Sequence, residues 1–296
     1  GVRIRSCLRP EDFLARVGGD EFGVIIENTK EVTTVINIVK SIHQQFERSF
    51  LIKKHEIIET ISIGITVCQG KNLSTEDIVR DADIAMYRAK SIGRGRYELF
   101  NKHMHIEAVK RIELESDIRR GIEEKEFFNR YQPIVCLETG ITHSMEALVR
   151  WAHPVKHEVS PAEFIPVAEE IGLIQSIDQI VLQSAIHELA AWRKALPAVS
   201  DLSVNVNHSA RHFSSRQSMD NILNHITNSD VEARYLKIEL TESSILNNEL
   251  MAFSLFEELR SKGVHLCMDD FGTGFSSLSY LRKLNFDMLK IDMSFI

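Results

Sequence analysis

The second half of this sequence alternates short apolar segments with longer amphipathic ones, and this order restricts the fold more than any other feature. The short segments have strand length and are rich in β-branched residues, whereas the long ones have helical spacing. Strands that alternate with helices form a largely parallel sheet, so we expect an α/β domain. The predicted strands are residues 128–135, 143–151, 202–207, 236–241, 264–269 and 288–291. The predicted helices are residues 161–172, 177–196, 219–226, 249–263 and 276–284.

The first hundred residues mix the same two patterns. Two apolar runs within residues 13–26 are separated by Gly18-Gly19-Asp20, which predicts a hairpin. Helical spacing follows over residues 30–48, and residues 57–67 predict one strand. Ser74 predicts the N-cap of a helix that Gly93 ends, with a last strand at 97–100. We therefore expect a domain over 1–100, a connecting helix over 101–116 and a second domain over 117–296.

Composition excludes several classes of protein. The chain has 296 residues, a net charge of −7 and 44% apolar residues, which suits two soluble globular domains rather than disorder. Negative charge disfavours binding to nucleic acid polymers, and no apolar run reaches the ~20 residues of a membrane span. The four cysteines form no CxxC pair, which argues against zinc and redox motifs. We expect a cytoplasmic protein, or the cytoplasmic part of one.

Polar side chains lie at or near the carboxyl ends of successive predicted strands. They are Glu146, Asn207, Glu239, Asp269, Asp270 and Lys290. In a (β/α) barrel these ends converge on one face, where the active site forms. Carboxylate and amide oxygens suit Mg²⁺ or Mn²⁺ better than zinc. Any one of these acids alone could be an ordinary solvated loop residue, but the set predicts a metal site.

Two points stay open at this level. Asn205 and Asn207 share a strand face, so alternation alone does not choose between them. Arg150 lies four residues beyond Glu146, about 13 Å along an extended strand, where it could bind a phosphate. Asp270-Phe271-Gly272 could belong to a protein kinase, but the HRDxxxxN motif and glycine-rich loop of kinases are absent.

Six sequence blocks in order resemble the EAL-domain cyclic-di-GMP phosphodiesterases. The blocks are Tyr131-Gln132-Pro133-Ile134, Glu146-Ala147-Leu148-Val149-Arg150-Trp151, Val206-Asn207-His208-Ser209-Ala210-Arg211, Glu239-Leu240-Thr241-Glu242, Asp269-Asp270-Phe271-Gly272-Thr273-Gly274 and Leu289-Lys290-Ile291-Asp292. The Ser-Ala-Arg that follows favours Asn207 over Asn205. His208 and His212 depart from the usual apolar residue and Gln, and we interpret both as tolerated variation.

The resemblance implies the roles of these residues. Two Mg²⁺ or Mn²⁺ ions would be held by five ligands, which are Glu146, Asn207, Glu239, Asp269 and Asp270. Lys290 would assist at the water nucleophile, and Glu242 would anchor the loop that starts at Asp270. The implied substrate contacts are Gln132, Leu148 and Arg150.

The first domain resembles the second half of a GGDEF diguanylate cyclase domain. The matching residues are Gly18-Gly19-Asp20-Glu21-Phe22, the helix segment from Ala82 to Lys90, and Gly93-Arg94. By resemblance Asp20 binds metal, Glu21 assists at the 3′-hydroxyl of GTP, and Lys90 and Arg94 bind its phosphates. Gly18 and Gly19 let the backbone approach the ligand. Arg9 and Asp12 stand where the family has its RxxD product-inhibition site.

The resemblance predicts a tandem GGDEF–EAL signalling protein of bacterial type. Its expected reaction is hydrolysis of cyclic-di-GMP to linear pGpG, with the GGDEF domain binding GTP or cyclic-di-GMP in a regulatory role. The alternatives are a dominant diguanylate cyclase activity and a non-catalytic cyclic-di-GMP receptor. We expect a homodimer. Because the first GGDEF half and the last EAL strands have no counterpart here, we expect an incomplete TIM-like barrel and little turnover by this chain alone.

Overall fold

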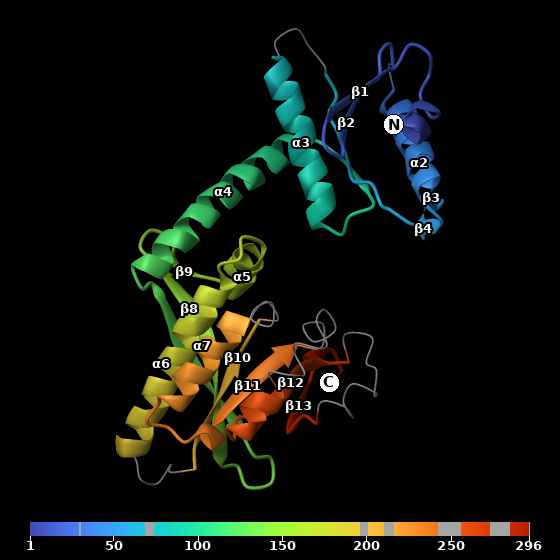
Figure 1. Cartoon of the computed structure of the whole chain (residues 1–296). Helices are drawn as coiled ribbons and strands as arrows, with labels where there is room; N and C mark the ends of the chain where they lie inside the picture. Colours follow the sequence, from blue (N-terminus) through green and yellow to red (C-terminus); the bar gives the residue numbers. More distant parts are fainter. Residues whose placement is uncertain are drawn as a thin grey trace. The chain divides into compact units, whose positions relative to one another are not determined.

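The computed structural model describes residues 1–29, 31–68, 74–195, 201–209, 216–241, 256–272 and 285–295 (Figure 1). The chain forms two compact units, residues 1–112 and 113–296, and the boundary falls inside helix α4 (Lys102–Glu123). This helix agrees with the charged helical segment that the sequence predicts before the second domain. No helix in the described part of the chain has the length and hydropathy that crossing a bilayer requires.

The described residues of the first unit form three small two-stranded sheets. Two are antiparallel and pair β1 with β2 and β3 with β4, while β5 and β6 pair in parallel. Its elements are α1 (Val2–Arg5), β1 (Phe13–Gly18), β2 (Glu21–Ile25), α2 (Val32–Phe46), β3 (Phe50–Ile52), β4 (His55–Ile57), β5 (Ile63–Ile65), α3 (Thr75–Ser91) and β6 (Tyr97–Leu99). The predicted hairpin, the two helices and the last strand are confirmed.

The prediction of one strand over residues 57–67 is wrong. Strand β4 ends at Ile57 and strand β5 begins only at Ile63. The two strands pair with different partners, because β4 returns along β3 while β5 lies beside β6. The chain therefore leaves one sheet and enters another, and β-propensity alone does not show where it changes partner.

Helix α3 starts with the predicted N-cap. The Ser74 hydroxyl accepts the Asp77 N–H at 3.1 Å, and the Asp77 carboxylate accepts the Ser74 N–H at 3.4 Å. This capping box satisfies two backbone donors that a helix start leaves unpaired. The helix packs tightly on β5, since a Cβ at Gly64 would lie 2.0 Å from the Ala82 carbonyl oxygen and 2.3 Å from the Met86 nitrogen.

The second unit is built on one mixed sheet with the order β13-β12-β11-β10-β8-β7, and β9 pairs with β8. Strands β8, β10, β11, β12 and β13 run in parallel, whereas β7 and β9 are antiparallel to β8. The strands are β7 (Phe127–Val135), β8 (Thr142–His153), β9 (His157–Val159), β10 (Ser203–Asn207), β11 (Leu236–Thr241), β12 (His265–Phe271) and β13 (Met288–Ile291). The predicted α/β class and all six predicted strands are confirmed.

Helices cover one face of this sheet (Figure 1). They are α5 (Pro161–Glu170), α6 (Ile174–Ala195), α7 (Arg216–Thr227) and a helix over 256–261, with short 3-10 turns η3 (Ala233–Tyr235) and η4 (Met293–Phe295). Of the predicted helices, 276–284 lies outside the described residues, and 249–263 is described only from 256. Among the described strands β7 and β13 are the outermost, so the pairings shown do not close a barrel.

Alternation along the strands divides the sheet into two chemically different faces. On the helix-covered face, Val204, Val206 and Ile238 are buried in the core. The rings of Phe127, Trp151 and Phe164 pack there with centroids 5.1–5.6 Å apart. Successive strand residues point to opposite faces, so the polar residues between these apolar ones point to the other side. That opposite face carries the candidate site.

Gly64→Ala tests the contact between β5 and α3. An added methyl group would overlap backbone atoms that cannot move aside, so we expect α3 to lose its packing. Hydrogen-exchange mass spectrometry on the whole chain should show at least tenfold faster exchange in residues 75–91. Gly23→Ala is the control, since its Cβ would lie 3.5 Å from the Val17 side chain. Equal exchange in both variants would show that the contact is not required.

Candidate metal centre

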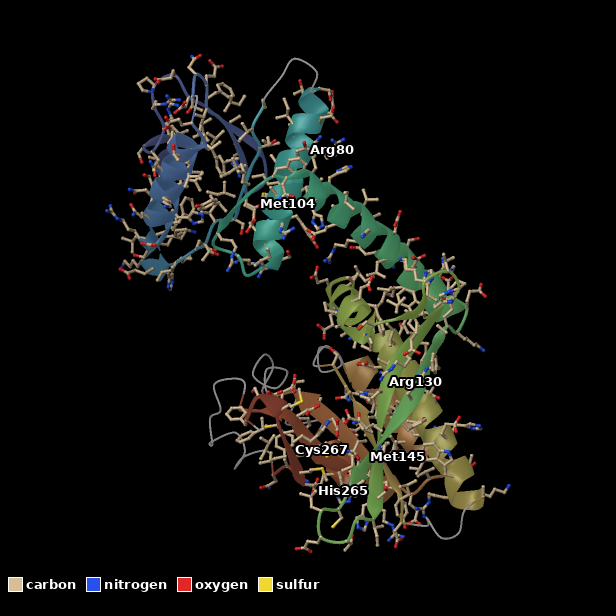
Figure 2. The ribbon with its side chains drawn as sticks, turned by 180° about the vertical axis from the view of Figure 1, so that it is seen from behind. Arg80, Met104, Arg130, Met145, His265 and Cys267 are labelled. Carbon is tan, nitrogen blue, oxygen red and sulfur yellow. The ribbon has the colours of Figure 1, made fainter. Side chains whose placement is uncertain are left out.

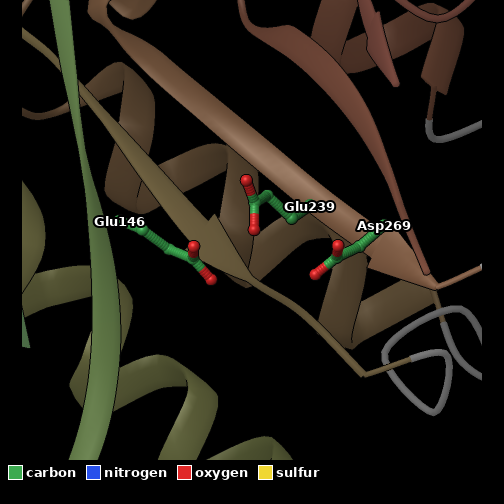
Figure 3. Close-up of side chains that lie close together, drawn as sticks. All are labelled: Glu146, Glu239 and Asp269. Carbon is green, nitrogen blue, oxygen red and sulfur yellow. The ribbon is translucent and has the colours of Figure 1, made fainter. Parts of the chain in front are cut away.

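Three carboxylates from three strands converge on the polar face of the sheet. Glu146 comes from β8, Glu239 from β11 and Asp269 from β12, and one oxygen of each lies within 4.8 Å of the others. Figure 3 shows the three side chains pointing into the same space. They are the one group of three such ligands found among the described residues. Parallel pairing explains the convergence, because Thr241 is level with Asp269 and Asn207 with Glu239.

Lys290 from β13 lies among the three carboxylates. Its Nζ is 2.8 Å from Glu239, 3.1 Å from Asp269 and 3.2 Å from Glu146. Burial alone would lower the pKa of Lys290, but the hydrogen bond to Glu239 and the charges of the three carboxylates outweigh it and raise that pKa. Lys290 is therefore an ammonium ion, and it supplies the positive charge that the cluster needs in this structure.

Two asparagines of β10 each hold a different carboxylate. Asn207 donates to Glu146 at 3.0 Å, and Asn205 donates to the fully buried Glu239 at 2.7 Å. The family pattern predicts Asn207 as the metal ligand, and the side chains of both asparagines lie on the site face. The role of Asn205 was missed, although its position two residues from Asn207 was a usable signal.

A buried chain of hydroxyl groups fixes the orientation of the Asn205 amide. The Ser203 hydroxyl donates to Ser144 at 3.0 Å, and the Ser144 hydroxyl donates to the Asn205 side-chain oxygen. With its oxygen accepting, Asn205 must present its NH₂ group to Glu239. Sequence reasoning also missed these two serines, which reach the site only because β8 and β10 pair side by side.

Burial raises the pKa of two groups at the cluster, the Glu239 carboxyl and the Cys267 thiol. Burial raises the pKa of Glu239, against the opposing hydrogen bonds from Asn205 and Lys290. Burial and the Glu239 charge raise the pKa of the Cys267 thiol to about 12. Its sulfur is not among the ligand atoms that converge here. The cluster therefore offers oxygen ligands alone.

Asp270 lies at the edge of the cluster rather than inside it. The residue is exposed, with a left-handed backbone at φ 54°, and its N–H bonds the Asp269 carboxylate at 3.0 Å. Partial burial and the charges of Asp269 and Asp292 raise its pKa. The structure brings together Glu146, Glu239 and Asp269, while the role of Asp270 as a ligand stays a prediction.

The predicted substrate residues share the face of the carboxylate cluster. Gln132 on β7 is directly opposite Glu146, and Leu148 and Arg150 follow Glu146 at alternate positions of β8. The Arg150 guanidinium donates to the Val149 carbonyl at 2.8 Å. These residues form a strip that leads away from the carboxylates along β8. Glu242 lies outside the described residues, as do Ala210, Arg211 and His212.

The residues predicted for a nucleotide site in the first unit lie on its surface. Gly18 ends β1, Gly19 and Asp20 form the turn to β2, and Gly19 takes the left-handed φ of 51°. Asp20 and Glu21 are exposed at the hairpin tip. Lys90 and Arg94 are exposed at the end of α3 and in the turn after it.

Arg9 and Asp12 of the first unit form a bidentate ion pair. Arg9 donates to both oxygens of the buried Asp12 carboxylate, at 2.7 and 3.1 Å, and also to the Glu27 carbonyl at 2.9 Å. The hydrogen bond from Arg9 holds the pKa of Asp12 below its usual range. Its role in inhibition stays a prediction.

Both units of the chain match known domain families. The EAL domain profile matches residues 115–296. The chain belongs to the EAL domain family. Residues 1–96 match the profile of the diguanylate cyclase, GGDEF domain, so this is a tandem GGDEF–EAL chain, as its motifs predicted.

Relatives with both domains match almost the whole chain. A protein of Pseudomonas aeruginosa named bifunctional diguanylate cyclase/cyclic di-GMP phosphodiesterase MucR is 35% identical over 99% of this chain and 42% of its own length. Cyclic di-GMP phosphodiesterase PdeR of Escherichia coli is 33% identical over all of this chain and 44% of its own length. The chain thus spans about two fifths of these curated relatives.

Solved EAL structures share the fold of the second unit. The phosphodiesterase of PaMucR, in complex with c-di-GMP, is 36% identical over 62% of this chain and 73% of that chain, with a TM-score of 0.58. The EAL enzyme Bd1971, with cAMP and cyclic-di-GMP bound, is 28% identical over 76% of this chain and 58% of that chain, with a TM-score of 0.59. EAL domains form a metal-dependent phosphodiesterase family, in agreement with the carboxylate cluster.

Lys290→Met tests whether the carboxylates require a cation. In EDTA, removing the ammonium leaves the buried Glu239 uncompensated, so we expect a melting temperature about 5–10 °C lower. Mn²⁺ should raise the melting temperature of the variant more than that of the wild type, because the metal replaces the missing charge.

Lys237→Met is the matched control, a half-buried lysine near the other end of β11, two strands from β13 in the sheet. It should respond to Mn²⁺ as the wild type does. If Lys290→Met melts at the wild-type temperature in EDTA, the carboxylates do not depend on this cation.

Proposed function

We propose that the protein containing this chain hydrolyses cyclic-di-GMP to linear pGpG with two Mg²⁺ or Mn²⁺ ions. The observation that carries the proposal is the cluster of Glu146, Glu239 and Asp269 around Lys290, in a chain that belongs to the EAL family. Hydrolysis adds water across one P–O ester bond and leaves a 5′-phosphate and a 3′-hydroxyl. Relatives named as cyclic di-GMP phosphodiesterases support the same substrate.

The donor set fits hard divalent ions. Glu146, Glu239 and Asp269 supply carboxylate oxygens, and the Asn207 and Asp270 side chains complete the proposed ligands. When bound, two such ions lower the pKa of a water and neutralise charge on the phosphodiester oxygens. Asn205 keeps Glu239 oriented toward the cluster, so the amide acts on geometry rather than on the substrate.

The other residues of the site face bind substrate and manage charge. Lys290 is an ammonium ion within reach of three carboxylates, so it can donate to the attacking water and hold it near the phosphorus atom. Arg150 offers a fork of donors to a phosphate, and Gln132 and Leu148 border the same strip. Glu242 is proposed to anchor the loop after Asp270.

We assign the GGDEF unit a regulatory role by ligand binding. The exposed residues Asp20, Glu21, Lys90 and Arg94 are proposed to bind GTP, and the Arg9–Asp12 pair to bind cyclic-di-GMP. The assignment rests on the fork of donors that the Arg9 guanidinium carries, which matches a phosphate and which Asp12 accepts in this structure. A homodimer is part of this proposal. A dominant cyclase activity and a non-catalytic receptor remain the competing functions.

Asp269→Asn tests the phosphodiesterase assignment in the longest natural protein that contains this chain. The substitution keeps the shape of the side chain but removes one negative charge from the metal ligands. We expect cyclic-di-GMP hydrolysis with Mg²⁺ or Mn²⁺ to fall at least about tenfold, which is ~1.4 kcal/mol in the barrier. Production of pGpG measured by chromatography gives the rate.

Asp287→Asn is the matched control, because Asp287 bonds the Leu266 N–H at 2.8 Å near the opposite end of β12. It should keep nearly the wild-type rate. An Asp269→Asn variant that hydrolyses cyclic-di-GMP at more than a tenth of the wild-type rate contradicts the assignment.

A further inference from the structure

A second charged cluster lies on the site face, beyond the carboxylates. Arg130 on β7 and Arg150 on β8 both contact Glu158 on β9, which joins the end of the same sheet. Figure 2 labels Arg130 on its strand. The strand registers pair Arg130 with Leu148 and Glu158 with Ala152, so all three charged side chains share the face of Glu146.

The single carboxylate of Glu158 bridges the two arginines. One of its oxygens is 2.6 Å from the Arg130 guanidinium, and the other is 3.5 Å from Nε of Arg150. One anion can therefore contact both guanidinium groups at once. A phosphate also presents several oxygens, and guanidinium forks match it well.

We propose that Arg130 is a substrate-binding residue that shares with Arg150 the phosphodiester of cyclic-di-GMP that is not being hydrolysed. This inference rests on the proposed function. A cyclic dinucleotide has two phosphodiesters, and the metal centre acts on only one of them. The strip from Glu146 through Leu148 to Arg150 extends about 13 Å from the metal ligand, a span on the scale of a dinucleotide.

Glu158 then acts as a competitor for the arginines rather than as their support. Arg150 also donates to the Val149 carbonyl at 2.8 Å, so its orientation does not depend on Glu158 alone. Glu158 is 44% exposed and can turn to solvent when a phosphate arrives. Two arginines and one glutamate leave a net positive charge, which attracts the dianionic substrate.

The experiment measures cyclic-di-GMP affinity by calorimetry, with Ca²⁺ in place of Mg²⁺ to suppress turnover. Every chain compared carries Arg9→Ala, which removes the other site proposed for this ligand, so "wild type" here means that background. Arg130→Ala should weaken binding about tenfold, since it removes a charge-assisted hydrogen bond. Glu158→Gln should tighten binding roughly threefold, because it removes a negative charge and keeps the size of the side chain. Arg130 is 61% exposed, so its substitution should leave the fold intact, which thermal melting checks.

Arg234→Ala and Glu232→Gln are the matched controls. These residues form an exposed ion pair at 3.0 Å beside β11, with side chains 61% and 63% exposed. Both variants should bind cyclic-di-GMP within twofold of the wild type. They separate a local effect of Arg130 from a general effect of surface charge.

The outcomes distinguish this inference from the proposed function. If the wild-type chain binds cyclic-di-GMP and Arg130→Ala binds it with the same affinity, the inference is wrong. The proposed function then still stands. If Glu158→Gln binds cyclic-di-GMP more weakly, Glu158 supports the arginines, and the claim that it competes with the substrate for them is wrong. A wild-type chain that does not bind cyclic-di-GMP overturns both.

Discussion

Like charges held together on the polar face of the sheet are the constraint on which the second unit depends. Glu146, Glu239 and Asp269 lie within a few ångströms of one another, and Glu239 is fully buried. Such carboxylates remain ionised together only when a cation lies among them. In this structure the cation is Lys290, and in the proposed enzyme divalent ions share that role. Stability and chemistry therefore depend on the same positive charge.

The sheet brings these charges together because one of its faces is apolar and packs under the helices, while the other face is polar. Apolar residues such as Val204 and Val206 fill the core under the helices, while Asn205 and Asn207 between them point to the site. The hydrogen-bonded serines below Asn205 leave it one orientation, which directs its NH₂ group at Glu239. The same alternation gives one strand both a packing role and a ligand-holding role.

Much of this arrangement could be predicted from the sequence, because strands and their polar ends follow local patterns. Six of the seven described strands of the second unit, all but β9, and the Ser74 cap were of this kind. The parts that could not be predicted depend on pairing between distant segments. Within residues 57–67 the chain leaves the β3–β4 sheet and enters the β5–β6 sheet. The Arg130–Glu158 contact depends on the registers of β7 and β9 against β8. Asp270 adjoins a ligand in sequence, yet a left-handed backbone and exposure separate it from the cluster.

The location of bound metal tests the central claim most directly. Crystals of the protein grown with Mn²⁺, with diffraction data collected at the manganese absorption edge, would show each ion as an anomalous peak. The account predicts the strongest peak among Glu146, Asn207, Glu239 and Asp269, with Lys290 moved away from at least one carboxylate. Manganese bound elsewhere, with Lys290 still contacting all three carboxylates, would contradict it.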